Sequence, residues 1–121
     1  MKLRTLTDNE KALYALTEVE LSNAQLAWDL ADDVEKAKTH IKRFHEKRNG
    51  LMKECGTQDK DDPNKYILEP KQVEEFNKKV DALLDVNVKI TFPTISLKEL
   101  KGIKVSAANI AAWKALKIVT K

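Results

Sequence analysis

The feature that most constrains this chain is a seam of apolar residues between positions 30 and 51. Successive members are alternately four and three residues apart, a spacing that aligns side chains along one face of a helix. Only Arg48 interrupts the pattern. The pattern predicts one helix over residues 23–54, about 48 Å long at a rise of 1.5 Å per residue. The seam consists of Leu30, Val34, Ala37, Ile41, Phe44 and Leu51.

Two uses of this seam remain open at the level of sequence. It packs on a later helix of the same chain, or part of it pairs with another chain, as a coiled coil or as a helix in a partner's groove. The second use predicts a homo-oligomer through the long helix or a complex with another protein. A helix of this length extends beyond an ordinary small domain in either case.

Capping residues and apolar periodicity predict four further helices. Thr7 followed by Glu10 has the form of a capping box, which starts the first helix near residue 8. Ser22 offers a cap that separates this first helix from the long one. Pro70 suits a first helical position, and Ser106 caps the last helix. The predicted ranges are 8–20, 70–84, 97–101 and 107–119.

Two strands complete the predicted fold. Val86, Val88, Ile90 and Phe92 alternate with polar residues, which predicts a half-buried strand over 86–92. A short apolar run predicts a second strand over 65–68, pairing antiparallel with the first. With only 3 Gly and 3 Pro in 121 residues, helix dominates. We therefore expect a single domain, mainly α with a small β element (α+β): a long helical hairpin, a short two-stranded antiparallel sheet and a C-terminal helix.

Charge and composition indicate in which cellular compartment the protein is found and which kinds of partner it binds. The 22 basic and 19 acidic residues give a net charge of +3, a small difference between two mixed populations and a weak indication of nucleic-acid binding. No window approaches the roughly 20 apolar residues of a membrane span, and the first residues carry no apolar signal core. Cys55 is the only cysteine, which suits a reducing compartment. We expect a cytoplasmic protein without membrane contact.

No residue pattern indicates catalysis, a cofactor or a metal site. His40 and His45 are five residues apart, whereas a metal-binding pair on a helix needs a spacing of three or four. The acidic stretch 58–63 lacks the glycine and the terminal glutamate of a calcium loop. The glycines are too scattered for a phosphate-binding loop. We therefore expect no enzyme activity and no cofactor.

The candidate partner-binding residues are aromatic or basic. Trp28 and Tyr14 are considered as anchors because Trp and Tyr contribute strongly to interface energies. A place in the core stays open for Trp28 as well as for Trp113, and Trp113 fits the core better. The basic stretch 36–48 of the long helix offers a second type of contact, although Glu46 punctuates it and weakens the case for nucleic acid. The candidate partner-binding residues are Trp28, Tyr14, Lys38, Lys42, Arg43 and Lys47.

The order of elements resembles a family of small proteins encoded by tailed bacteriophages and prophages. The resemblance includes a short first helix, a long charged helix, an acidic loop, and closing segments at 95–100 (ISLKEL) and 103–108 (IKVSAA). It implies a phage origin and expression in the bacterial host cytoplasm, and it supplies no catalytic residue. The expected function is to bind and modulate a host or phage protein. The alternative is a virion tail component or assembly factor that self-associates.

Overall fold

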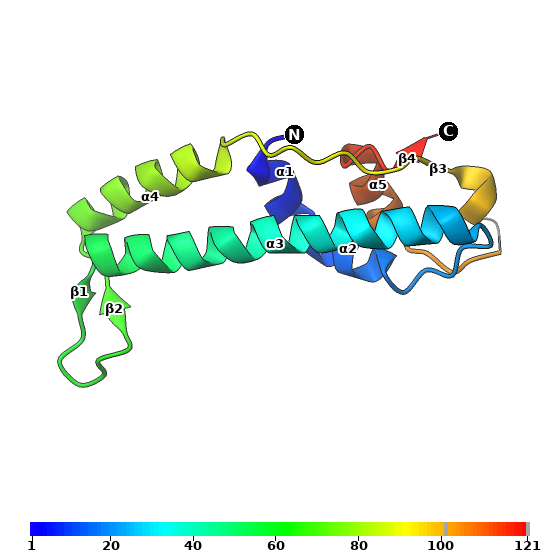
Figure 1. The fold of residues 1–121 in the computed structure, drawn as a ribbon. Helices are drawn as coiled ribbons and strands as arrows, with labels where there is room; N and C mark the ends of the chain where they lie inside the picture. Colours follow the sequence, from blue (N-terminus) through cyan, green and yellow to red (C-terminus); the bar gives the residue numbers. More distant parts are fainter. Residues whose placement is uncertain (101, 121) are drawn as a thin grey trace.

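The computed structural model describes residues 1–100 and 102–120. Helix α3 (Ala24–Cys55) runs along the whole molecule, and α4 (Pro70–Leu84) returns along its C-terminal half (Figure 1). This pair is the predicted helical hairpin, and the chain is mainly α with small β elements, as the sequence predicts. Two shorter helices, α2 (Glu10–Leu16) and α5 (Ala107–Ala115), lie beside the N-terminal half of α3, and α1 (Leu3–Asp8) lies beside its middle.

The seam of α3 is buried inside its own chain. Five of its members, from Leu30 to Phe44, belong to the main core, and Leu51 is half-buried. They pack with apolar residues of α1 and α2 and with residues near the C-terminus. Although α3 is 32 residues long, no helix within the described residues is both long and apolar enough to cross a membrane. The other large core residues include Leu6, Leu13, Trp113, Leu116 and Ile118.

The long helix begins one residue later than predicted. Its N-cap is Asn23, whose side-chain oxygen accepts a hydrogen bond of 3.0 Å from the backbone N–H of Leu26. The predicted cap at Ser22 is therefore wrong, because asparagine is an equally strong cap and lies in the correct register. The predicted bounds of α4 are confirmed, with Pro70 at the first helical position.

The first predicted helix, 8–20, is wrong at both ends. The chain forms two short helices separated at Asn9, and α2 ends at Leu16. The Thr7 hydroxyl does not act as a helix N-cap; it donates a hydrogen bond of 3.1 Å to the Arg4 carbonyl. Helix begins earlier because Leu3, together with Leu6, is buried in the core, so tertiary packing extends helical structure upstream.

The antiparallel sheet exists and contains the strand predicted at 65–68, but the partner of that strand is not the predicted segment 86–92. Strand β2 (Tyr66–Ile67) pairs with β1 (Thr57–Gln58), forming a hairpin at the distal end of α3. Segment 86–92 is not a strand: it makes one isolated bridge, between Asn87 and Lys2. The alternation matches burial only in the second half of the segment, where Ile90 and Phe92 belong to the core, whereas Val86 is exposed.

A second, parallel pair of strands closes the C-terminal region. Strand β3 (Ile95–Ser96) pairs with β4 (Val119–Thr120), and the sequence patterns did not predict this pair. The short helix predicted at 97–101 is a 3₁₀ turn, η1 (Leu97–Leu100). Residue 101 lies outside the described residues.

The last helix stops four residues before its predicted end at 119. Helix α5 ends at Ala115, and Lys117 then adopts a left-handed backbone with φ of 61°. The N–H of Ile118 donates a 2.8 Å hydrogen bond to the carbonyl of Trp113. This is a Schellman-type helix end. It turns Ile118 into the core and frees the next residues for strand β4.

Candidate functional site

Trp28 is the most exposed large apolar side chain among the described residues, at 76%. It lies in the second turn of α3, two residues before the buried Leu30. Two residues correspond to about 200° around a helix, so Trp28 points away from the seam. Asp32 and Glu35 follow on the same outer face and are also exposed. The indole is therefore an isolated apolar group on a charged helix face.

Tyr14 and Lys38 contact each other across α2 and α3. The ammonium nitrogen of Lys38 lies 5.3 Å from the centre of the Tyr14 ring, within range of a cation–π interaction. Lys38 also lies 3.3 Å from a carboxylate oxygen of Glu35, and the Tyr14 hydroxyl donates a 2.9 Å hydrogen bond to Glu10. Partial burial, and then this hydrogen bond, raise the pKa of Tyr14. These contacts hold the two side chains in place.

The four basic candidates lie on two different sides of α3. Lys38 and Lys42 are four residues apart and lie on the side nearest α2. Arg43 and Lys47 are also four residues apart, but they lie on the opposite side, toward the chain that follows α4. Together with Trp28 on the outer face, the six candidates therefore do not form one patch.

The structure contains a groove that the sequence did not reveal. It lies between α3 and the chain at the end of α4 and has a volume of about 420 Å³. Its apolar lining comes from Leu3, Phe44, Leu83, Val86 and Val88. Its polar lining comes from His40, Arg43, Lys47, Asn87 and Lys89.

One signal of this groove was readable in the sequence. His40, Arg43 and Lys47 follow a spacing of i, i+3 and i+7, which places them on one side of a helix. The opposite wall was not readable, because Val86 and Lys89 reach the groove only through the tertiary fold. The sequence therefore identified Arg43 and Lys47 but missed the residues that face them.

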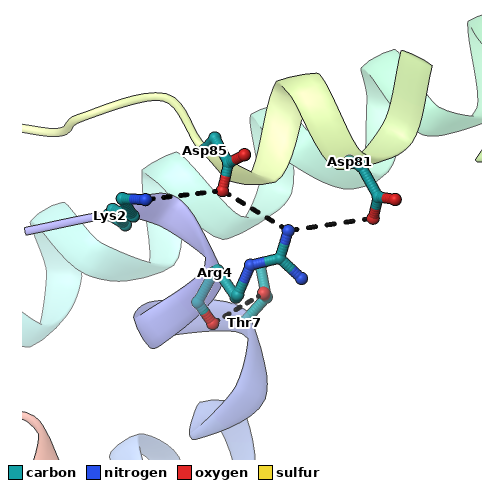
Figure 2. Close-up of polar contacts among 5 residues, drawn as sticks. All are labelled: Lys2, Arg4, Thr7, Asp81 and Asp85. Atoms are coloured by element: carbon teal, nitrogen blue, oxygen red, sulfur yellow. Dashed lines mark hydrogen bonds and ion pairs between the residues drawn. The ribbon is translucent and has the colours of Figure 1, made fainter. Parts of the chain in front are cut away.

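The wall opposite α3 is attached to the N-terminus of the chain (Figure 2). One Arg4 guanidinium nitrogen lies 3.4 Å from a carboxylate oxygen of Asp85 and 3.7 Å from one of Asp81. Lys2 approaches Asp85 at 3.7 Å. The backbone N–H of Leu3 also donates a 2.8 Å hydrogen bond to the Val86 carbonyl. These contacts hold the segment after α4 in an extended course beside α3.

The histidines and the cysteine do not form a reactive cluster. Cys55 is buried at the end of α3, whereas His40 lines the groove. His45 lies 3.5 Å from a carboxylate oxygen of Glu10. Within residues 1–100 and 102–120, no group of three or more His, Cys, Asp or Glu side chains is placed to hold a metal ion.

Two surface features stand out, the exposed ring of Trp28 and the groove beside α3. Trp28 supplies an aromatic ring in solvent, and the groove supplies apolar side chains beside positive ones. Comparisons of the chain with protein-family models, with curated proteins and with solved structures find no match.

Proposed function

We propose that this chain is a non-enzymatic protein that binds another protein and modulates it, with Trp28 as a principal contact. The observation that carries the proposal is the 76% exposure of Trp28, against 1% for Trp113. The fold uses one tryptophan as core and leaves the other in solvent. Tryptophan is enriched among the residues that dominate binding energies, so Trp28 is suited to anchor a partner.

The proposed partner is a host or phage protein in a bacterial cytoplasm. The resemblance of the sequence to small proteins of tailed phages supports a phage origin. The charged residues that surround Trp28 on α3, such as Asp32 and Glu35, suit the polar rim of an interface around an aromatic anchor. The protein would act stoichiometrically, by occupying a surface of its partner.

Two alternatives receive less support. A virion component that self-associates through the long helix would need a surface other than the buried seam. Nucleic-acid binding would need a continuous basic face, but Lys36 lies 3.2 Å from Asp32 and Lys38 lies 3.3 Å from Glu35. These ion pairs reduce the charge available to phosphates.

Affinity capture from phage-infected bacterial lysate tests the proposal. The wild-type chain is compared with Trp28→Ala and Trp28→Phe, and with Leu97→Ala as a control at another exposed apolar residue. We expect Trp28→Ala to lower recovery of the specific partner about tenfold or more. Trp28→Phe should lower it less, and Leu97→Ala should leave it unchanged. Equal recovery by all four chains would remove Trp28 from the interface.

Light scattering coupled to size exclusion tests the self-association alternative. Because the seam is internal, we expect the mass of one chain across a wide concentration range. A stable oligomer would instead favour the virion or assembly reading.

A further inference from the structure

We propose that the groove between α3 and residues 83–89 binds an acidic amphipathic helix of a partner protein. This inference goes beyond the contact at Trp28, which lies on a different face of α3. It rests on the chemistry of the groove wall, on the charge state of its rim and on the spacing of its basic residues.

The floor of the groove is apolar and is formed partly by the buried side chains of Leu3 and Phe44. Phe44 and Leu83 line it from the two helices, and Leu3 lines it from α1. Val86 also lines it and is 47% exposed, which leaves apolar area that a partner can cover. A volume of about 420 Å³ accepts a few side chains of a segment rather than a folded domain.

The rim of the groove carries uncompensated positive charge. Arg43, Lys47 and Lys89 line it, and none of the three lies in an ion pair with another described residue. Within the described chain, no acidic side chain lines the groove. By contrast, Lys36 and Lys79 on the same two helices are paired with carboxylates. Charge complementarity therefore selects an acidic partner.

The spacing of the basic residues favours a helical partner. His40, Arg43 and Lys47 extend along α3 for two helical turns, about 10 Å. A partner helix that lies beside α3 has the same rise per residue. Acidic residues at the same spacing on that partner helix can therefore pair with this row of α3. Its apolar residues then enter the groove, as in other helix-in-groove complexes. A nucleic acid would match the charge but would leave the apolar walls uncovered.

Fluorescence anisotropy with a short synthetic peptide tests this inference. The probe carries Leu and Phe on one helical face and Glu elsewhere; a matched peptide has every Glu replaced by Lys. We expect the full-length chain to bind the acidic peptide and not the basic one. The double variant Arg43→Glu/Lys47→Glu should weaken acidic-peptide binding about tenfold or more and should bind the basic peptide instead.

A control variant distinguishes binding in the groove from nonspecific attraction by the net charge of the protein. Lys53→Glu/Lys78→Glu makes the same change in net charge at exposed residues of α3 and α4 that do not line the groove. It should bind the acidic peptide within about twofold of wild type. Val86→Asp should abolish binding, and circular dichroism checks that each variant is folded. Trp28→Ala should bind normally, so the groove is tested separately from the proposed Trp28 contact.

Three results would overturn the inference. The first is no binding of the acidic peptide at the highest soluble concentration. The second is equal weakening by the groove pair and by the matched pair, which would mean nonspecific attraction. The third is a single-stranded oligonucleotide that displaces the peptide and binds more tightly, which would identify a polyanion site.

Discussion

The indole nitrogen of Trp113 donates a hydrogen bond of 2.7 Å to the backbone carbonyl of Ala12. The two residues are 101 positions apart, and the contact is fully buried. It attaches α5 to α2, so the last helix is fixed against the first part of the chain. The ring itself fills the centre of the core and is 1% exposed.

Two substitutions of Trp113 should separate the contribution of its hydrogen bond to stability from the contribution of its ring. Trp113→Phe removes the donor and part of the ring, and should lower the free energy of unfolding by about 1–3 kcal/mol. Trp113→Ala also leaves a cavity and should lower it by about 3–5 kcal/mol. Urea unfolding followed by circular dichroism measures both. Trp28→Phe is the control and should leave stability nearly unchanged, because its ring lies in solvent. Equal losses at the two tryptophans would contradict this placement.

The fold was predictable where one segment alone carries the signal. The seam of α3 repeats over several turns, and Pro70 marks the start of α4, so both helices follow from local periodicity. Segment 86–92 shows the limit of such reasoning. Its alternation matches the burial of Ile90 and Phe92 but not the exposure of Val86. A strand also needs a neighbouring strand, and that neighbour is determined by tertiary packing. The parallel pair β3 and β4 joins residues more than 20 positions apart and has no local signature.

Glycine at position 117 should make the protein more stable than the native Lys117 does. It is exposed and has a φ of 61°, a backbone conformation that costs an L-residue about 1 kcal/mol or more. Glycine adopts this conformation freely and is the usual residue at this position of a helix end. Lys117→Gly should therefore raise the free energy of unfolding by about 0.5–1 kcal/mol, measured by urea unfolding. Lys114→Gly, inside the helix, is the control and should lower it by a similar amount.

The ion pairs of Arg4 should contribute little to overall stability. Arg4, Asp81 and Asp85 are all substantially exposed, and pairs of this kind are worth about 1 kcal/mol or less. Arg4→Ala should therefore lower the free energy of unfolding by less than about 1 kcal/mol. The difference from wild type should shrink further in high salt. Leu6→Ala, a fully buried neighbour in α1, should cost about 2–5 kcal/mol in the same urea experiment. A large, salt-independent loss for Arg4→Ala would show that its aliphatic stem supports the core.

The candidate sites were only partly predictable for a related reason. The burial of Trp113 was predicted, whereas the sequence left open whether Trp28 lies in the core or in solvent, and the structure exposes it. The groove needs two walls that are about 40 residues apart in the sequence, one from α3 and one from the chain after α4. Arg43 and Lys47 are visible as basic residues on a helix. The apolar side chains that line the groove beside Arg43 and Lys47 are brought there only when α4 packs on α3, so the sequence does not identify them.

Lys79 gives a pH-dependent test of that packing. Its ammonium nitrogen lies 2.7 Å from a carboxylate oxygen of Glu54 on α3 and 3.4 Å from one of Glu75 on its own helix. The hydrogen bond with Glu54, followed by the one with Glu75, raises the pKa of Lys79 above its ordinary value. The folded state therefore binds this proton more tightly than the unfolded state. The resulting stabilisation is complete below the ordinary lysine pKa and is lost as the pH rises through the raised folded pKa.

Lys79→Gln should therefore be less stable than wild type at neutral pH, and the difference should disappear only when the pH exceeds the raised pKa of Lys79 in the folded state. Because the side chains are largely exposed, the difference should be small, and it is best measured by urea unfolding of both chains at each pH. Glu54→Gln removes the first partner and should lower the pKa of Lys79 toward its ordinary value, which NMR titration of the side chain detects. The double variant Lys79→Gln/Glu54→Gln completes a double-mutant cycle, which separates the interaction energy of this pair from the effects of other groups that titrate in the same pH range. A stability difference that stays constant from neutral to alkaline pH would mean that Lys79 supports α4 through packing of its stem rather than through its charge.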